Sequence, residues 1–362
     1  MNDVAKTFVG IFLAVLIAIP GRSAAPDPTP SGQASFLIGA LVADGFLWIL
    51  SDGGTLSRVS LDDRKISKET TLDPVLGMCG VDGDVEIVSS KPNDPKWVLS
   101  RRQAAAWTVK ATVETGGDRF MGMACAPAAV TILTQRRLIR ISASRQDVVT
   151  LSKALSSNGV ASVYTTAADV FVGLDAGEWG GGLDRIDRHT GVVTVLQDNA
   201  SGAICGGPLN PACDPVNAIT ADPWAPGCVV AAIGLVHFAP HGRIIEVCSD
   251  RIKRLYFKPY DWGAQRNRTI GDEPFSTVAF YGVSAGDNVL TAVGIDGLYR
   301  IHRDGTAESV PLPHFDDVGG VYVSRNLPGF ILVLTDVNRR RSISGSAPML
   351  VSRSGLDDGK KR

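Results

Sequence analysis

The sequence predicts an all-β fold, and three observations support this prediction. Residues 170–197 contain short apolar or β-branched runs, separated by a glycine-rich turn and by a Thr190-Gly191 turn. Weaker copies of this plan recur before and after it, without any stretch of helical periodicity. The 39 glycines and 20 prolines are scattered along the chain, as many short strands joined by tight turns require. Together they predict a β-propeller of about seven four-stranded antiparallel blades.

Seven repeated units account for most of the chain. We place them at residues 36–61, 81–113, 121–151, 160–197, 216–259, 277–312 and 319–353. We anchor their second strands at Trp48, Trp97, Thr131, Phe171, Val229, Leu290 and Leu332. These anchors are spaced by about 47 residues on average, which lies within the range of propeller blades. A β-sandwich or two stacked all-β domains are the alternatives, and neither requires such a period.

Turn residues separate the strands within the units. Asp44-Gly45 and Asp52-Gly53 lie between apolar runs of the first unit, and Asp296-Gly297 repeats this chemistry in the sixth. Asp-Gly pairs favour two-residue hairpins because both positions accept a positive φ. In the fifth unit we place the turn at His241-Gly242, and residues 260–274 read as an exposed polar insertion.

The N-terminus resembles an export signal. Residues 8–19 form an uninterrupted apolar run behind Lys6, and small residues follow at 21–25. This run is too short to span a bilayer comfortably and suits the core of a signal peptide. An uncleaved membrane anchor is the alternative. We therefore expect a periplasmic or extracellular protein with a signal peptide at 1–25, a linker at 26–35, the propeller at 36–355 and a polar tail at 356–362.

Net charge and cysteine content limit the partners and the compartment. A formal net charge of -1 gives no overall attraction to nucleic acid, and we expect a monomer without a nucleic-acid partner. Six cysteines behind an export signal fit disulfides in an oxidising compartment; buried free thiols are the alternative. Cys205 and Cys213 bracket a loop, Cys228 and Cys248 flank a hairpin, and Cys79 and Cys125 remain to pair by default.

Residues 47–63 (LWILSDGGTLSRVSLDD) resemble the blade repeat of two-component-regulator sensor propellers. That repeat has an LWIGT-type strand, a glycine-rich turn and a strand that ends near Asp. Residues 170–191 are similar, and residues 297–305 match its second half. Such propellers are periplasmic sensing domains joined to a transmembrane helix and a kinase. The resemblance implies the sensing fold, whereas we expect neither a kinase nor a second membrane span in this chain.

The most unusual loop of the sequence contains Glu178 and Trp179, followed by the triple glycine 180–182. An exposed tryptophan beside a carboxylate could stack on a sugar or another flat ligand, and glycine lets backbone approach a ligand closely. Alternatively, the tryptophan packs between neighbouring blades. Asp184 and Arg185 follow and complete the predicted ligand-binding set; Asp184 with Asp187 could hold calcium, although strand alternation would separate them. No other cofactor is predicted.

His237 and His241 are the candidate metal ligands, with Asp214, Asp222 and Glu246 close by in the sequence. Their four-residue spacing would suit a metal on a helix, whereas Pro240 and Gly242 argue against a helix here. The insertion at residues 205–223 could act as a lid or simply protect a sheet edge.

Two functions remain open at this point. The first is a binding or sensing module for a small molecule, a carbohydrate or a protein, because the loops are unusual and catalytic motifs are absent. The second is a metal-dependent lactonase or lyase of propeller type. It requires polar side chains from several blades to converge, and its candidates are Asp82, Asn217, His237 and Asp296.

Overall fold

The computed structural model describes residues 37–352 except 64, 72, 104–105, 157–158, 200–205, 238, 264–268, 271–272, 275, 287, 313–322, 328–329 and 335–348. The predicted signal peptide, linker and tail lie outside these residues. The described chain consists of β-strands and one short 3-10 helix, η1 (Gly177–Trp179). None of its helices is both long and apolar enough to cross a membrane. It divides into two compact units, Met1–Glu114 with Pro313–Arg362 (unit 1) and Thr115–Leu312 (unit 2).

Unit 1 contains two four-stranded antiparallel sheets, blades 1 and 2, in which strands neighbour one another in chain order. Blade 1 consists of β1 (Leu37–Ala43), β2 (Phe46–Ser51), β3 (Leu56–Ser60) and β4 (Ile66–Lys68). Blade 2 consists of β5 (Val75–Val81), β6 (Asp84–Ser89), β7 (Lys96–Gln103) and β8 (Ala106–Glu114). A further sheet has three strands, β27 (Val323–Leu327), β28 (Phe330–Leu334) and β29 (Met349–Ser352).

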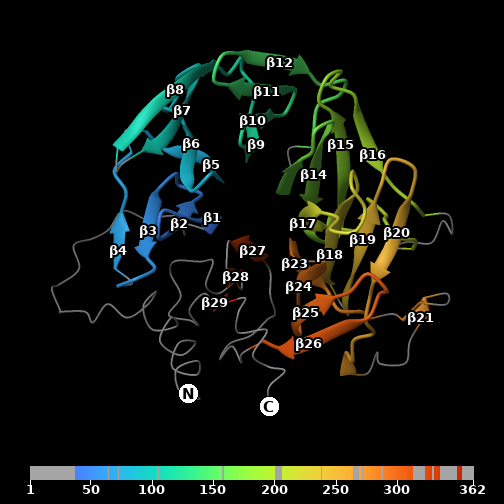
Figure 1. Ribbon diagram of the computed structural model, residues 1–362. Coiled ribbons are helices and arrows are strands. Elements are labelled where there is room, and N and C mark those ends of the chain that lie inside the picture. Colours follow the sequence, from blue (N-terminus) through green and yellow to red (C-terminus); the bar gives the residue numbers. More distant parts are fainter. Residues whose placement is uncertain are drawn as a thin grey trace, which may run out of the picture. The chain divides into compact units, whose positions relative to one another are not determined.

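Unit 2 contains four more four-stranded sheets of the same plan, which follow one another from green to orange in Figure 1. Blade 3 consists of β9 (Phe120–Ala126), β10 (Ala129–Thr134), β11 (Arg137–Ser142) and β12 (Gln146–Thr150). Blade 4 consists of β13 (Val160–Thr165), β14 (Asp169–Asp175), β15 (Gly181–Asp187) and β16 (Val193–Leu196). Blade 5 consists of β17 (Val216–Ala221), β18 (Val229–His237), β19 (Ala239–Val247) and β20 (Ile252–Tyr256). Blade 6 consists of β23 (Phe280–Gly286), β24 (Val289–Gly294), β25 (Gly297–Ile301) and β26 (Ala307–Pro311). The short strands β21 (Thr269–Ile270) and β22 (Glu273–Pro274) pair in the predicted insertion.

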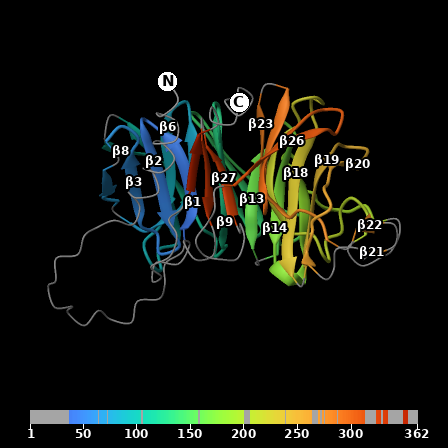
Figure 2. The same cartoon turned by 90° about the horizontal axis from the view of Figure 1, so that it is seen from below.

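The fold is therefore an all-β propeller, as predicted, with six four-stranded blades. The expectation of about seven such blades is wrong, because the last predicted unit, residues 319–353, supplies only the three described strands β27, β28 and β29. The first strands of successive blades pack side by side in unit 2: β9 on β13, β13 on β17, and β17 on β23. In Figure 2, the unit 2 strands β13, β14, β18 and β23 are seen from the side and run roughly vertically.

The second strands β2 and β14 are apolar on both faces because both faces meet a neighbouring sheet. In β14, Val170 and Val172 belong to a buried core shared with blade 3, whereas Phe171 belongs to a core shared with blade 5. In β2, Leu47 packs toward β28 and Trp48 toward blade 2. Side chains alternate between the two faces of a strand, so burying both faces gives the continuous apolar runs seen in the sequence.

Hairpin turns follow the predicted chemistry in blade 1. Asp44 and Gly45 have φ values of 51° and 73° and connect Ala43 to Phe46, which are paired. This is the left-handed conformation that favours an Asp-Gly pair in a two-residue hairpin.

Two sequence predictions about the strands are wrong. Trp97 lies in β7, the third strand of blade 2, because β5 precedes the start that we predicted for this unit. The turn of blade 5 does not lie at His241-Gly242: His237 pairs with Ala239, and both His241 and Gly242 belong to β19.

Disulfides are present as predicted. Cys228 and Cys248 form a disulfide that joins the N-terminal end of β18 to the C-terminal end of β19. Cys79, Cys125 and Cys213 are also disulfide-bonded, and none of the described cysteines is free. Cys205 lies outside the described residues. Free thiols are therefore the wrong alternative for the cysteines that the structure describes.

Candidate functional site

The loop between β14 and β15 carries the most exposed large apolar side chain among the described residues. Trp179 is 82% exposed, so it is not packed between blades. The loop is ordered by short contacts: the Gly177 amide donates to Asp175 Oδ1 at 2.8 Å, and the Gly180 amide donates to the Gly177 carbonyl at 3.2 Å. An indole held outward by a fixed backbone offers a flat apolar face to a ligand.

The triple glycine lets this loop pack against the chain itself. A Cβ at Gly180 would lie 2.4 Å from the Pro211 carbonyl oxygen, and one at Gly181 would lie 2.1 Å from the Leu174 oxygen. The Gly181 amide donates to Pro211 O at 3.0 Å, and the Gly182 amide donates to Asp214 O at 2.8 Å. The glycines therefore allow the close approach of β14 and of the insertion backbone.

Glu178 reaches the neighbouring blade. Its Oε2 lies 2.8 Å from Nδ1 of His237, at the end of β18, and both side chains are about two-fifths exposed. The two predicted site residues are 59 positions apart in the sequence numbering and belong to blades 4 and 5. This pair places an acceptor and an ionisable ring beside the exposed indole.

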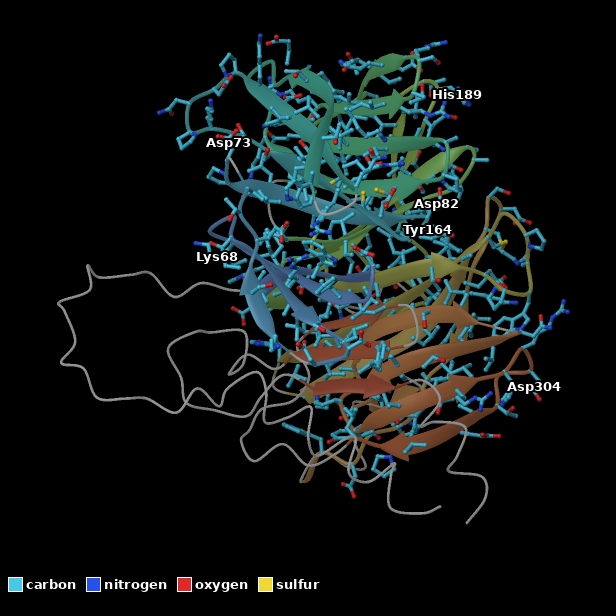
Figure 3. All side chains as sticks on the ribbon, turned by 60° about the vertical axis from the view of Figure 1, so that its left-hand side comes forward. Lys68, Asp73, Asp82, Tyr164, His189 and Asp304 are labelled. Atoms are coloured by element: carbon cyan, nitrogen blue, oxygen red, sulfur yellow. A yellow bond between two sulfur atoms is a disulfide. The ribbon has the colours of Figure 1, made fainter. Side chains whose placement is uncertain are left out.

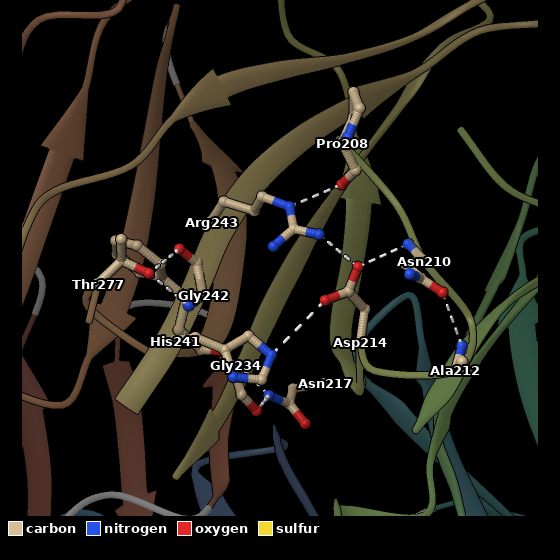
Figure 4. Close-up of polar contacts among 11 residues, drawn as sticks. Pro208, Asn210, Ala212, Asp214, Asn217, Gly234, His241, Gly242, Arg243 and Thr277 are labelled. Carbon is tan, nitrogen blue, oxygen red and sulfur yellow. Dashed lines mark hydrogen bonds and ion pairs between the residues drawn. The ribbon is translucent and has the colours of Figure 1, made fainter. Parts of the chain in front are cut away.

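A buried ion pair supports the insertion beneath the loop (Figure 4). Asp214 is fully buried, and its Oδ2 pairs with Nη2 of Arg243, which is 5% exposed. The Asn210 amide donates to the same oxygen at 2.6 Å, and Arg243 Nε donates to the Pro208 carbonyl at 2.8 Å. Because an arginine and a carboxylate bury each other's charge here, residues 208–214 are held to β19 by side chains as well as backbone.

The candidate metal ligands do not share a carboxylate. His237 contacts Glu178, whereas Nε2 of His241 lies 3.6 Å from Oδ1 of Asp214. Both histidines are on the face of the β18–β19 hairpin that packs toward blade 4, since Leu235 is paired with His241. Within the described residues no group of three or more His, Cys, Asp and Glu side chains could hold a metal ion.

Asp184 and Arg185 do not join the Trp179 surface. Asp184 is paired with Val172 and faces blade 3, whereas Arg185 is paired with Phe171 and faces blade 5. Burial raises the pKa of Asp184, which is 5% exposed. Asp187 instead accepts the amides of its own turn, and these bonds lower its pKa. The strand thus separates the two carboxylates that a calcium ion would have to share.

The candidates for a catalytic centre have separate partners. Asp82 lies in the exposed β5–β6 turn of unit 1 (Figure 3), with a φ of 51°. In unit 2, Asn217 Nδ2 donates to the carbonyls of Gly234 and Phe280, both at 2.9 Å. Asp296 instead lies 3.0 Å from Lys258 Nζ.

The first strands of the unit 2 blades offer no alternative set. The four strands β9, β13, β17 and β23 carry no Asp, Glu or His. The structure therefore gives no support to convergence of acidic groups and histidines along these strands.

Two features of this site carry no sequence signal that we recognised. Arg243 was not among the candidates, although it neutralises Asp214. The pairing of Glu178 with His237 is also invisible in the sequence, since neither residue stands in a known motif.

No known protein-family profile matches the chain, and no curated protein matches it. Solved structures are similar at low identity. One is the extracellular domain of BT4673 of B. thetaiotaomicron, named both a one-component and a hybrid two-component system; the TM-score is 0.53 at 15% identity, over 88% of this chain and 38% of that one. The chain thus spans well under half of that domain. The similarity is one of propeller fold, and the fold is the part of the sequence resemblance that it confirms.

Two other similar structures come from different settings. YCF48 from Cyanidioschyzon merolae has a TM-score of 0.53 at 13% identity, over 92% of this chain and 99% of that one. Hydrazine synthase of Kuenenia stuttgartiensis has a TM-score of 0.56 at 10% identity, with the same two coverages. Identities this low show a shared fold and nothing finer.

Proposed function

We propose that this protein is an exported binding or sensing module whose contact surface is formed by Trp179, Glu178 and His237. The single observation that carries the proposal is the indole of Trp179, which is 82% exposed on a loop whose backbone is fixed. Large exposed aromatic side chains on rigid loops are typical anchors of binding surfaces.

The chemistry of this surface favours a ligand with a flat apolar face and a nearby hydroxyl or amide. The indole supplies stacking area, while the Glu178 carboxylate and the His237 ring, which lie 2.8 Å apart, supply polar contacts. A sugar ring has both features, and so does an extended peptide. YCF48, which has the same fold, is also known in a complex with a D1 peptide.

The remaining expectations belong to this proposal. Residues 1–25 act as a signal peptide, 26–35 as a linker, 36–355 as the propeller and 356–362 as a tail. The protein works in the periplasm or outside the cell, as a monomer and without a bound cofactor. The extracellular setting of the BT4673 domain is consistent with such a location.

Glycan and peptide arrays probed with the purified mature protein test the function. The wild type should give a set of hits that Trp179→Ala loses, while Trp262→Ala, a change at a 38% exposed tryptophan elsewhere, should keep them. Removing a stacking aromatic should weaken binding by about 1–3 kcal/mol, which is roughly 5-fold to 160-fold in affinity. If Trp179→Ala retains every hit of the wild type, the assigned surface is wrong.

A further inference from the structure

A second concave site lies between blades 3 and 4, whereas the Trp179 loop contacts blade 5. It encloses about 360 Å³, which is within the size range of small-molecule pockets. Its apolar lining comes from Leu138 on β11 and Val149 on β12, which are directly paired, and from Ala167 in the β13–β14 turn of blade 4. Blade 3 therefore supplies an apolar wall to the site, and a turn of blade 4 supplies the facing side.

The charged groups around this groove are unbalanced. Three guanidinium groups line it, those of Arg140, Arg145 and Arg188, together with the exposed ring of His189, labelled in Figure 3. The lining contains a single carboxylate, Asp147, which accepts a hydrogen bond from Arg145. Arg140 is exposed, and among the described residues it forms no ion pair. One anionic side chain thus stands against three permanent cations.

Arg188 is held in place by carbonyl groups, and no acidic partner for it is found among the described residues. Its Nη1 donates to the carbonyl oxygens of Thr166 and of Ala167, the second at 3.3 Å. Burial lowers the pKa of Arg188, and the neighbouring Arg140 guanidinium lowers it further. Two positive groups of the same groove therefore lie close enough to repel each other, and Asp147, which is paired with Arg140 across the two strands, is the one carboxylate among the lining residues.

We propose that this groove binds a small organic anion, with an apolar body against Leu138 and Val149 and a phosphate, sulfate or carboxylate group between Arg140 and Arg188. Arginine pairs with these groups through parallel hydrogen bonds, and an anion placed here would relieve the repulsion between the two guanidinium groups. The site is independent of the Trp179 surface, so either assignment can fail without the other.

Calorimetric titration of the full mature protein with phenyl phosphate tests this proposal. Phenyl sulfate and benzoate distinguish the anionic group, inorganic phosphate lacks the apolar body, and benzyl alcohol lacks the charge. We expect saturable binding of at least one aryl anion, weaker binding of inorganic phosphate, none of benzyl alcohol, and an affinity that falls as NaCl is added.

Variants then locate the binding. Arg140→Gln should weaken the affinity roughly tenfold or more, as expected for losing a hydrogen bond to a charged group. Ala167→Glu, which adds a carboxylate to the exposed rim, should abolish binding. Arg303→Gln, in the exposed turn of blade 6, serves as the matched control and should bind like the wild type. Absence of saturable binding of all three aryl anions, or equal binding by Arg140→Gln and the wild type, would overturn the proposal.

Discussion

The two faces of blade 5 each bury acidic side chains but neutralise them in different ways. Toward blade 4, Asp214 is fully buried and pairs with the buried Arg243. On the other face Glu246 and Asp222 are 4% and 6% exposed, and Glu246 also pairs with two half-exposed cations, Arg251 at 3.1 Å and Lys253 at 3.2 Å. One face thus holds a fixed ion pair, and the other holds two neighbouring carboxyl groups.

The two arrangements differ in how they contribute to the stability of the fold. The first is a buried arginine–carboxylate pair, and the second contains a carboxyl group whose pKa is raised. The Asp214–Arg243 pair is buried on both sides and docks the insertion under the Trp179 loop. Burial and the adjacent Glu246 side chain raise the pKa of Asp222. We infer that the first arrangement, and not the second, contributes to the rigidity of the candidate binding surface.

Removing Asp214 should have the largest effect on stability. Asp214→Ala leaves the Arg243 guanidinium buried without its carboxylate and removes the acceptor of the Asn210 amide. We expect a loss of about 3–5 kcal/mol in the free energy of unfolding. Denaturant unfolding of the purified protein measures it, and Asp62→Ala at an exposed turn is the control, with a change within about 0.5 kcal/mol.

The double variant Asp214→Leu with Arg243→Met sharpens this result. Replacing both partners removes the uncompensated charge, so it should be more stable than Asp214→Ala. A loss below about 1 kcal/mol for Asp214→Ala itself would mean that the ion pair does not hold the insertion.

The disulfide of blade 5 should rank second. Cys228 and Cys248 are separated by 20 positions, and releasing a loop of this length costs about 3 kcal/mol by loop-closure entropy. The pair Cys228→Ser with Cys248→Ser should therefore lower the midpoint of thermal unfolding by several degrees. An unchanged midpoint would show that the strand pairing of β18 with β19 suffices without the bond.

Some features of the fold were readable from the sequence because they are local. The Asp44-Gly45 hairpin and the strands of residues 170–197 follow from turn chemistry and continuous apolar runs. Each of these depends on neighbours within a few positions of the chain.

Other features depend on contacts between blades and had no local signal. Gly242 suggested a turn, yet it lies within β19. A Cβ there would stand 2.3 Å from the Ile233 oxygen and 2.7 Å from the Val278 oxygen, so this position of the strand requires glycine. Here glycine marks the close approach of another strand and not a reversal of the chain. Arg243 and Asp214 meet across 29 positions, and no spacing rule pairs them.

Substituting Asp222 tests the opposite face and should have a smaller effect that depends on pH. The folded-state pKa of Asp222 lies above its unfolded value, so its ionised form opposes folding. Asp222→Asn keeps an oxygen for the amides of Trp224 and Ala225. It should be more stable than the wild type at neutral pH, with a difference that shrinks on acidification and disappears below the unfolded pKa of about 3.9.

Urea unfolding at about pH 7.5 and about pH 3.5 measures this dependence. Asp304→Asn is the control, because that exposed carboxyl accepts hydrogen bonds from Thr306, which lower its pKa. The pKa of Asp304 is shifted in the opposite direction to that of Asp222, so Asp304→Asn should not stabilise the protein at neutral pH. An equal gain in the free energy of unfolding for Asp222→Asn at both pH values would contradict the inference that the raised pKa of Asp222 opposes folding.

The smallest effect on stability is expected at the proposed contact residue itself. Trp179 is 82% exposed, so Trp179→Ala should change the free energy of unfolding by no more than about 0.5 kcal/mol. The buried Trp48 gives the matched comparison, since Trp48→Ala should cost about 3–5 kcal/mol. Denaturant unfolding of both variants separates the two roles. If Trp179→Ala destabilises the fold by more than about 1 kcal/mol, the indole supports the loop, and the division between a buried support and a free contact surface fails.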